Sequence, residues 1–425
     1  AIGSGGREHA LCWALAKTRG REVEVTCAPG NAGIAQVAEC APVGATDIPA
    51  LVRLAEEKGI ELTVVGGEAP LAAGVVDEFE RRGLLIAGPT RAAARLESSK
   101  AFAKDFMSRH KIPTARYRIA DSASAALEVL RSGEFGASDS SVVVKADGLA
   151  AGKGVIVARS LAEAEAAVND LMGRGSAGAE AARRVVLEET LEGPEASLLL
   201  FSDGRDYALM PAARDHKRVG EGDAGPNTGG MGAFTDASVL DEATLARAER
   251  EIVLPTLEGA HWEGIPFRGV LFIGLMLTLD GPRVLEYNVR FGDPETQAIL
   301  VRLKSDLVSI FEAVARGGLK SVPVEWGEES SACVVLAARG YPARPETGAR
   351  IEGLERAARH AGVQIFHAGT ARSPEGDWLT AGGRVLGVTA TGAMLEEALR
   401  RCYDAAGEIR WEGMHYRRDI GRPRN

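Results

Sequence analysis

A lysine followed by a glycine-rich turn, set between two runs of β-branched residues, is suited to holding a phosphate group. The run Val142–Val144 leads into Lys145, and a second run, Val155–Val157, follows the turn. The glycines of the turn are Gly148, Gly152 and Gly154. Two such runs predict a β-hairpin. Glycines without Cβ atoms let backbone N–H groups approach an anion, and the lysine supplies charge. The alternative is a plain hairpin with a roomy turn.

A second candidate site lies on one face of the predicted strand Val284–Arg290. Because side chains alternate along a strand, Glu286, Asn288 and Arg290 share a face, and the apolar residues between them share the other. Carboxylate and amide oxygens suit Mg²⁺ or Mn²⁺, and a neighbouring guanidinium suits a phosphate or carboxylate. The alternative is the solvated face of an antiparallel strand.

The segment from Asp215 to Phe234 contains six glycines among 20 residues and has almost no apolar periodicity. We therefore predict no regular structure here. Loops of this length in compact domains are usually functional or disordered. The charged string Asp-His-Lys-Arg, together with Asn-Thr-Gly-Gly-Met, favours a functional loop.

Three further stretches carry polar groups with open interpretations. The turn Gly3–Gly6 before a predicted helix offers free N–H groups to a phosphate, or is simply a tight turn. Carboxylates in Glu188–Glu195 either form a solvated edge or line a pocket. Lys100 and Lys104 share a helix face, and solvated lysines are the ordinary interpretation.

The order of predicted elements divides the chain. Strands and helices alternate through about residue 90, which predicts a parallel α/β unit. A small α/β unit at residues 117–188 contains the phosphate hairpin and could move as a lid. The last hundred residues predict an α+β unit with a hairpin at Gly382-Gly383, and we find no chemical constellation there.

Composition limits the possible functions. The 425 residues are 45% hydrophobic and 26% charged, with a net charge of -9, and no long basic run predicts a nucleic-acid surface. The most apolar stretch, Val270–Leu279, is far below the ~20 residues of a membrane span. Five scattered cysteines without a Cys-x-x-Cys pair suggest a reducing cytosol. We expect no secretory leader, and we expect a few residues to be missing before Ala1.

Taken together, these stretches resemble the ATP-grasp ligases, and within them the phosphoribosylamine–glycine ligases (glycinamide ribonucleotide synthetases) of purine biosynthesis. The resemblance covers essentially the whole chain, and the string at 215–233 is its most specific part. Other matching strings are Gly-Ser-Gly-Gly-Arg-Glu-His-Ala at 3–10, Ala-Pro-Gly-Asn-Ala-Gly at 28–33, Gly-Pro-Thr at 88–90, Ser-Lys-Ala-Phe-Ala-Lys-Asp-Phe-Met at 99–107, Lys-Ala-Asp-Gly-Leu-Ala-Ala-Gly-Lys-Gly-Val at 145–155, Arg-Phe-Gly-Asp-Pro-Glu-Thr-Gln at 290–297, Ala-Arg-Gly-Tyr-Pro at 338–342, Phe-His-Ala-Gly-Thr at 366–370 and Tyr-Arg-Arg-Asp-Ile-Gly at 416–421. Gly67 departs from the pattern, which has proline there.

The resemblance implies a multidomain fold of α/β and α+β units. Its parts would be an N-terminal Rossmann-like domain at 1–97, a central ATP-grasp domain at 98–116 and 189–320, a lid at 117–188, and a C-terminal α+β domain at 321–425. ATP would lie between lid and centre, with Mg²⁺ or Mn²⁺. The other partners would be glycine and 5-phosphoribosylamine, with no nucleic acid or membrane, and the protein would be a cytoplasmic monomer.

The resemblance also implies roles for individual residues. Lys104, Lys145 and the turn of Gly148, Gly152 and Gly154 would hold the ATP phosphates. The Glu188 carbonyl and the Leu191 N–H would contact adenine, and Glu195 would contact the ribose. Glu286 and Asn288 would bind the metal. Lys145, Arg290, Asp215 and Lys217 would take part in catalysis, and the phosphoribosylamine would lie against Gly5, Gly6, Asp215, Lys217, Gly229, Gly230 and Arg290.

The implied reaction joins a carboxylate to an amine through an acyl phosphate. ATP would phosphorylate the glycine carboxylate, and the amine would then displace phosphate without an enzyme nucleophile. Two alternatives remain from the sequence. One is another ATP-grasp ligase, such as a biotin-dependent carboxylase, and the other is a non-catalytic nucleotide-binding regulator.

Overall fold

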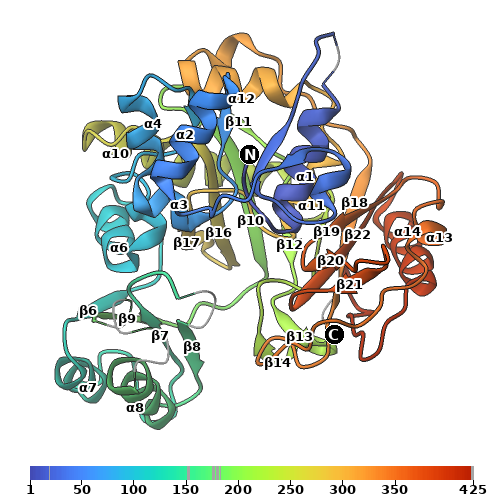
Figure 1. Cartoon of the computed structure of the whole chain (residues 1–425). Coiled ribbons are helices and arrows are strands. Elements are labelled where there is room, and N and C mark those ends of the chain that lie inside the picture. The colour runs from blue at the N-terminus through green and yellow to red at the C-terminus, as the bar shows by residue number, and fades with distance from the viewer. Residues whose placement is uncertain (19, 151–153, 175–177, 179–180, 182, 423–425) are drawn as a thin grey trace.

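A long antiparallel sheet forms the centre of the molecule, and an N-terminal unit and a separate small unit lie beside it (Figure 1). The computed structural model describes residues 1–18, 20–150, 154–174, 178, 181 and 183–422. Gly152, predicted to contact phosphate, lies outside the described residues. Within the described residues, no helix combines the length and the apolar character needed to cross a membrane.

The N-terminal unit contains parallel strands, as expected from its alternating elements. Its strands are β1 Ile2–Gly3, β2 Thr26–Pro29, β3 Glu39–Cys40, β4 Thr63–Val64 and β5 Ile86–Ala87. Its helices are α1 Gly6–Ala16, α2 Ile48–Lys58, α3 Glu68–Ala73 and α4 Val75–Arg81, with a short 3-10 turn at Ile34–Gln36. β1, β2 and β3 pair in parallel, β4 pairs with β5, and a bridge from Ile2 to Val65 joins the two sets. Ile2 and Leu71 are among its buried core residues.

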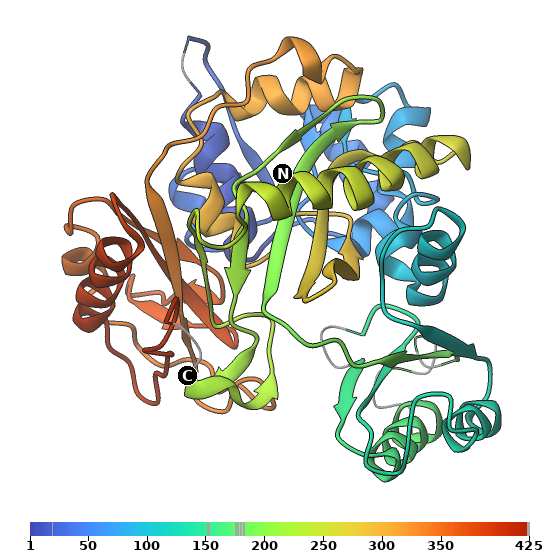
Figure 2. The ribbon, with the colours of Figure 1, turned by 180° about the vertical axis from the view of Figure 1, so that it is seen from behind.

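Two helices, α5 Arg95–Ser98 and α6 Lys100–Arg109, connect this unit to a separate small unit, the lid. The elements of the lid are β6 Tyr117–Ala120, α7 Ala123–Arg131, β7 Val142–Ala146, β8 Val155–Ala158, α8 Leu161–Val168, η2 Asn169–Arg174 and β9 Val185–Glu189. The sheet order is β6-β9-β7-β8, and β7 and β8 pair antiparallel from Val142–Ala158 to Lys145–Val155. The predicted hairpin is therefore confirmed. The lid has its own apolar core and projects from the rest of the molecule (Figures 1 and 2).

The central sheet runs from one side of the molecule to the other. Its strands are β10 Glu195–Asp203, β11 Tyr207–Leu209, β12 Ala213–Asp215, β15 Gly232–Thr235, β16 Arg268–Thr278, β17 Gly281–Asn288, β18 Ser330–Ala337, β19 Val363–His367 and β22 Arg384–Gly392. Their order is β17-β16-β10-β12-β15-β18-β22-β19, with β11 paired to β10. The C-terminal strands thus extend the sheet of the centre, which brings side chains from both parts to one surface.

Helices cover both faces of this sheet. They are α9 Glu242–Ala248, the π-helical segment η4 Glu249–Val253, α10 Leu254–Trp262, α11 Glu295–Leu300, α12 Leu307–Arg316, α13 Leu354–Ala357 and α14 Leu395–Glu408, with a 3-10 turn at Leu319–Ser321. α9 and α10 cross one face (Figure 2), where Ile252 and Val253 are buried. On the other face Ile299 of α11 and Phe311 of α12 share an apolar cluster with Leu11 of α1. The first turn of α1 is thereby held beside the sheet.

Two local predictions were wrong. The segment 215–233 contains a hairpin of β13 Arg218–Gly220 and β14 Ala224–Asn227 around a 3-10 turn at Glu221–Asp223. The buried Arg417 guanidinium holds this hairpin through Asp223, at 2.7 Å. No hairpin forms at Gly382-Gly383, because β21 Trp378–Thr380 pairs with β20 Thr370–Arg372, and β22 pairs with β18 and β19. Short-range periodicity does not reveal such long-range partners.

Candidate active site

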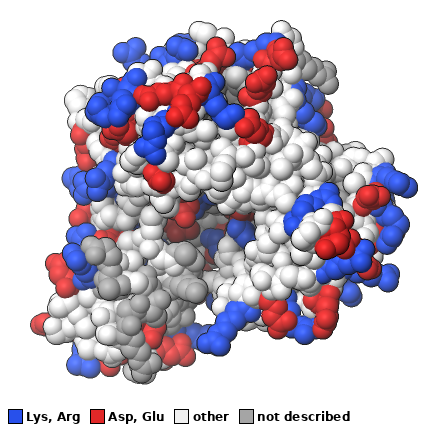
Figure 3. Space-filling view, viewed as in Figure 1, with Lys and Arg blue, Asp and Glu red and all other residues white. Residues whose placement is uncertain are grey.

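A β-bulge brings the lid and the centre together. Gly274 of β16 pairs with Glu286 and Leu275 pairs with Val284, so Leu285 is left out of the ladder. Its carbonyl accepts a hydrogen bond of 3.0 Å from the Lys145 ammonium of the lid. Bulges redirect groups near active sites in this way. The predicted phosphate-binding lysine therefore lies beside the strand of the predicted metal ligands. The surface of the molecule is hollowed between the lid and the C-terminal part (Figure 3).

Lys104 and Lys145 converge on one buried carboxylate. Glu188 of β9 pairs through Oε2 with Lys104 at 2.8 Å and through Oε1 with Lys145 at 2.9 Å. The Lys104 ammonium also donates to the Thr114 hydroxyl at 2.8 Å. Lys104 and Glu188 are each 2% exposed, so the interpretation of Lys104 as a solvated lysine was wrong. Burial lowers the pKa of Lys104 to about 8, against the opposing charge of Glu188.

Asp147, which the sequence analysis did not select, joins the phosphate turn to α6. Its carboxylate accepts hydrogen bonds of 2.8 Å from the Ser99 hydroxyl and from the Ala101 N–H at the start of α6. Its other oxygen pairs with Arg184 at 2.6 Å. Lys100 donates to the Gly148 carbonyl at 3.3 Å. The only available signal was the position of Asp147 in the string Lys-Ala-Asp-Gly.

Glu286 lies in a basic environment on β17. Burial raises its pKa, but the charges of Lys217, Lys145 and Lys100 outweigh that effect and lower it. Lys217 is 4.0 Å from Glu286 Oε1. Asn288 follows on the same face, and its Oδ1 accepts a hydrogen bond of 3.1 Å from Arg290. An ionised carboxylate beside an amide oxygen fits Mg²⁺, which usually takes one or two protein ligands together with phosphates and waters.

Arg290 is held between a buried acid, Glu97, and a partly exposed acid, Glu68, from the N-terminal region. It pairs with Glu97 at 2.8 Å and with Glu68 at 3.1 Å, and it donates to the Phe291 carbonyl at 3.1 Å. The Val289 N–H donates to the second Glu97 oxygen at 2.8 Å. Burial raises the pKa of Glu97, although Arg290 opposes that rise. These contacts fix the guanidinium at the end of β17, next to Asn288.

Acidic side chains also cluster around Lys217. Its ammonium pairs with Glu195 at 3.0 Å. Burial raises the pKa of Asp215, and Glu195 and Glu286 add to that rise against the charge of Lys217. Glu295 at the start of α11, which the sequence analysis did not select, is buried and interacts with Asp215 and Lys217. Burial and the charge of Asp215 raise the pKa of Glu295 to about 7. The carboxylates thus surround Lys217, which follows β12 and lies 4.0 Å from the metal-ligand candidate Glu286.

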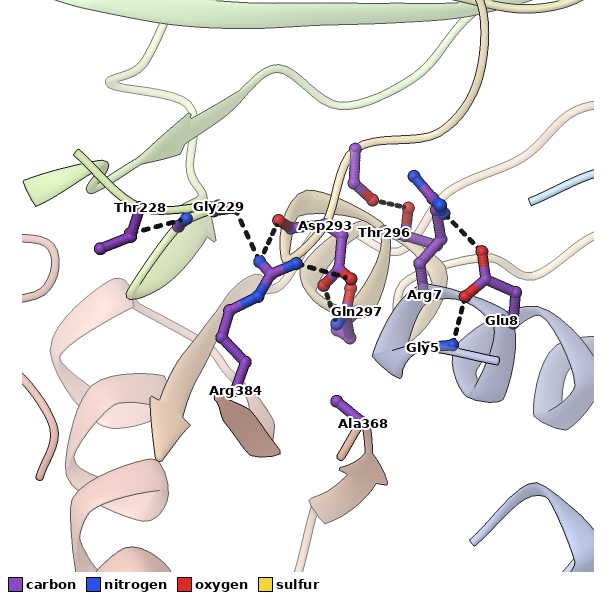
Figure 4. Close-up of polar contacts among 12 residues, drawn as sticks. Gly5, Arg7, Glu8, Thr228, Gly229, Asp293, Thr296, Gln297, Ala368 and Arg384 are labelled. Carbon is purple, nitrogen blue, oxygen red and sulfur yellow. Dashed lines mark hydrogen bonds and ion pairs between the residues drawn. The ribbon is translucent and has the colours of Figure 1, made fainter. Parts of the chain in front are cut away.

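A third group of contacts lies around the first turn of α1 (Figure 4). It joins the N-terminal unit, the 215–233 segment, α11 and the C-terminal strand β22. Arg384 of β22 donates to the Gly229 carbonyl at 2.7 Å and to the Asp293 carbonyl at 2.6 Å. It also pairs with the Asp293 carboxylate at 3.0 Å, while Gln297 donates to the other Asp293 oxygen at 2.7 Å. Gly5 donates through its N–H to Glu8 Oε2 at 2.6 Å. Arg384, from the part in which the sequence predicted no chemical constellation, thus joins this polar network.

The glycines of this group are close to their neighbours. A Cβ on Gly6 would lie 2.7 Å from Gln297 Nε2 and 3.5 Å from Ala368 Cβ. Gly230 has a φ of +113°, and a Cβ there would lie 2.5 Å from Pro294 Cδ. Gly6 thus lies in the interface between α1 and α11. Gly230 lies in the interface between the 215–233 segment and the loop before α11.

Replacing Gly230 with alanine should lower the free energy of unfolding by roughly 1–3 kcal/mol, because its φ is unfavourable for an L side chain and its Cβ would contact Pro294. Denaturant titration measures this change. Gly83→Ala is the matched control, since Gly83 has a φ of +71° and a Cβ there would have no atom within 4 Å. An equal loss in both variants would mean that the contact with Pro294 costs nothing.

The remaining predicted residues lie in the lid or on its connection to the centre. Gly148 donates through its N–H to the Ala181 carbonyl at 3.1 Å, and the Gly154 carbonyl accepts from the Ala146 N–H at 2.8 Å, at the base of the turn. Leu191 follows β9, and Glu195 begins β10, so both lie on the connection from lid to centre. The structure thus gathers two sets of predicted residues, one around Lys145 and Glu286 and the other around Gly5 and Gly229.

Family models match nearly the whole chain. The N domain of phosphoribosylglycinamide synthetase matches residues 1–97, its ATP-grasp (A) domain matches residues 98–296, and its C domain matches residues 331–423. The chain belongs to the phosphoribosylglycinamide synthetase family.

Relatives in the phosphoribosylglycinamide synthetase family have similar sequences over 99% of this chain. The phosphoribosylamine–glycine ligase of Xylella fastidiosa is 51% identical over 423 residues, which are 99% of this chain and 96% of that protein. The phosphoribosylamine–glycine ligase of Brucella melitensis is 49% identical over 422 residues, with the same coverage of both chains. A match of this length includes the lid, the centre and the C-terminal strands.

Solved structures match the same family and the wider fold. The crystal structure of a phosphoribosylamine–glycine ligase from Thermotoga maritima is 38% identical, has a TM-score of 0.84 and covers 99% of each chain. A biotin carboxylase structure from Campylobacter jejuni has a TM-score of 0.71 at 15% identity and covers 97% of this chain and 91% of its own. The second similarity concerns the fold alone. The synthetase family member therefore has the multidomain ATP-grasp architecture, with α/β and α+β units.

Proposed function

We propose that this protein is an ATP-dependent ligase that joins glycine to 5-phosphoribosylamine. The products are glycinamide ribonucleotide, ADP and phosphate, and the reaction belongs to purine biosynthesis. The observation that carries the proposal is the full-length membership of the phosphoribosylglycinamide synthetase family. The contact between the Lys145 ammonium and the Leu285 carbonyl supports it, because a lid lysine and the candidate metal strand share one site.

The nucleotide phosphates are proposed to bind between lid and centre. Lys104 and Lys145 supply positive charge there, and the turn that contains Gly148 and Gly154 begins three residues after Lys145. Glu188, Leu191 and Glu195 lie along the connection that would face adenine and ribose. Glu286 and Asn288 would hold Mg²⁺ or Mn²⁺, which when bound neutralises charge on the phosphate oxygens.

The chemistry requires groups that stabilise negative charge rather than a nucleophile on the protein. The glycine carboxylate attacks the terminal phosphorus of ATP, giving glycyl phosphate and ADP. The amine nitrogen then attacks the acyl carbon, phosphate leaves, and the nitrogen loses a proton. Arg290 and Lys217 are proposed to stabilise the oxygens. The carboxyls of the half-buried Asp215 and the buried Glu295 lie near Lys217, with pKa values raised by loss of solvation, and can accept that proton.

The phosphoribosylamine is proposed to bind at the first turn of α1. That turn presents the positive end of a helix dipole to a phosphate, beside Gly5 and Gly6. Gly229 and Gly230 face the same region, and Arg384 adds a guanidinium from the C-terminal part. Asp293 pairs with Arg384, so the substrate phosphate would compete for that arginine.

One assay tests the function. ADP release is measured with ATP, Mg²⁺, glycine, ribose 5-phosphate and ammonia, and again with glycine omitted. Ribose 5-phosphate and ammonia together supply the amine substrate in solution. We expect ADP release to require glycine. Release that is unchanged without glycine, or that requires bicarbonate instead, would contradict the proposal and favour another ATP-grasp ligase.

The two alternatives from the sequence are not favoured. A carboxylate–amine ligase with different substrates is disfavoured because relatives named phosphoribosylamine–glycine ligase cover 99% of the chain. A non-catalytic regulator would not need Lys145, Glu286 and Asn288 together, and all three are present. We also propose that the protein acts as a monomer in the cytoplasm on small molecules only. Its five cysteines are free thiols, as in a reducing compartment.

A further inference from the structure

We propose that the Glu188 side chain is a positioning residue that keeps Lys104 charged and aimed at the nucleotide phosphates. This inference rests on the proposed function, since it assigns Lys104 to nucleotide binding. It differs from the sequence-based assignment, in which only the Glu188 backbone contacts adenine. The side chain would act through the two lysines and need not touch the nucleotide.

The geometry that supports this role is a buried Lys–Glu–Lys group. Lys104 comes from α6, Glu188 from β9 and Lys145 from β7. The carboxylate uses one oxygen for each lysine, at 2.8 Å and 2.9 Å. The three side chains are 3%, 2% and 7% exposed. Ions this deeply buried require an ionic partner, because removing a charge from water is costly.

The surroundings of Lys104 leave Glu188 as its main counter-charge. Thr114 contributes a neutral hydroxyl at 2.8 Å. Lys145 on β7 is a like charge that disfavours the ammonium form, and Glu286 on β17 favours it more weakly than Glu188 does. The buried acid of α5, Glu97, faces Arg290 and Lys100. Without the Glu188 charge, the ammonium of Lys104 would therefore lose its proton near neutral pH.

Only the protonated, positively charged form of Lys104 attracts a phosphate, so nucleotide binding should weaken as the pH rises above the pKa of Lys104. Burial lowers the pKa of Lys104 to about 8, while the pair with Glu188 raises it. Removing an opposite charge at this distance lowers a lysine pKa by about 1–3 units. Above that pKa, the nucleotide Kd increases about tenfold for each pH unit, because each unit removes nine-tenths of the charged form.

The test is nucleotide binding rather than turnover. The Kd of ADP with Mg²⁺ is measured by calorimetry between about pH 7 and 9.5, where the nucleotide phosphates are already ionised. The wild-type Kd should be constant up to about pH 8 and then increase. In Glu188→Gln the increase should begin at least about one pH unit lower, so that ADP binds at least about fivefold more weakly than to the wild type at pH 8.

Matched variants separate this role from a general structural one. Glu189→Gln changes the next carboxylate, which pairs with Arg116 at the surface, and should retain the wild-type curve. Glu188→Asp keeps the charge at a greater distance and should shift the curve by a smaller amount in the same direction. This variant still tests the inference if Glu188→Gln does not fold. In Lys104→Met, alone or combined with Glu188→Gln, the increase of the ADP Kd above about pH 8 should disappear.

Each outcome bears on one claim. A curve for Glu188→Gln that overlays the wild type, or lies above it by a constant factor at every pH, would overturn the positioning role. An unshifted curve for Glu188→Asp would do the same if the glutamine variant is unfolded. Failure of the wild-type protein to bind ADP at any pH would instead contradict the proposed function and is distinguishable from both.

Discussion

Replacing Glu286 with glutamine is expected to lower kcat by about 10²–10³-fold while the fold is retained. Glu286 is the ionised carboxylate of the candidate metal site, and Lys217, Lys145 and Lys100 keep its pKa low despite burial. Glutamine keeps the shape of the side chain and removes its charge. Glutamine therefore binds a divalent cation more weakly, and the charge on the phosphate oxygens is less well neutralised when phosphate is transferred to glycine.

The measurement is steady-state ADP release as a function of Mg²⁺ concentration, with the far-ultraviolet circular dichroism spectrum and the Tm as checks on folding. Asp280→Asn is a suitable control, because Asp280 lies at the turn between β16 and β17 and its side chain is 85% exposed. That variant should have wild-type turnover and Mg²⁺ dependence. Wild-type kcat in Glu286→Gln at limiting Mg²⁺ would remove Glu286 from the metal site.

Replacing Arg290 with methionine is expected to lower the free energy of unfolding by about 3–5 kcal/mol, in addition to abolishing most activity. The cause is the buried acid that remains. Glu97 loses its 2.8 Å partner, and Glu68 loses its 3.1 Å partner. Methionine retains much of the arginine volume, so the change is mainly one of charge. Urea titration at pH 7 measures the loss of stability, and ADP release measures the loss of activity.

The stability loss should depend on pH with a definite sign. Burial already raises the pKa of Glu97 above its usual value, and Arg290 opposes that rise. In Arg290→Met the folded-state pKa of Glu97 therefore increases further above the unfolded-state value. A raised acid pKa costs stability as pH rises from the unfolded-state pKa through the folded-state pKa. The difference between variant and wild type should be largest at neutral pH and should decrease toward mildly acidic pH.

A double variant separates stability from catalysis. In Arg290→Met/Glu97→Gln the buried negative charge is absent, so much of the lost stability should return, as is often found when a whole buried ion pair is replaced. Activity should not return, because the guanidinium proposed to stabilise the reacting oxygens is still missing. Recovery of turnover in the double variant would contradict a catalytic role for Arg290 and leave it a structural one.

Local sequence was sufficient for the parts of the site built from consecutive residues. The alternation predicted for this strand is confirmed for Glu286 and Asn288, since Tyr287 between them is buried in the core, whereas the strand ends at Asn288 and Arg290 follows it. The runs around Lys145 correctly predicted the β7–β8 hairpin. Both results depend on the two-residue alternation of strands, which is set by backbone geometry within a few residues.

Contacts between distant residues could not be predicted in the same way. Lys104 looked solvated because its partner Glu188 is 84 residues away. Arg384 lies in a part that was expected to lack chemistry, and its partners Gly229 and Asp293 are 155 and 91 residues away. The hairpin within 215–233 has few apolar residues and is tied to Arg417, 194 residues beyond Asp223.

The sequence by itself determined which chemical groups are available, namely lysines beside a glycine turn, oxygen ligands on one strand face and a helix start rich in glycine. Only the tertiary structure decided which charges meet, so that Glu188 joins two lysines and Arg384 reaches Asp293. The physical reason is that electrostatic interactions depend on distance and burial in space. The order of residues along the chain specifies neither of these quantities.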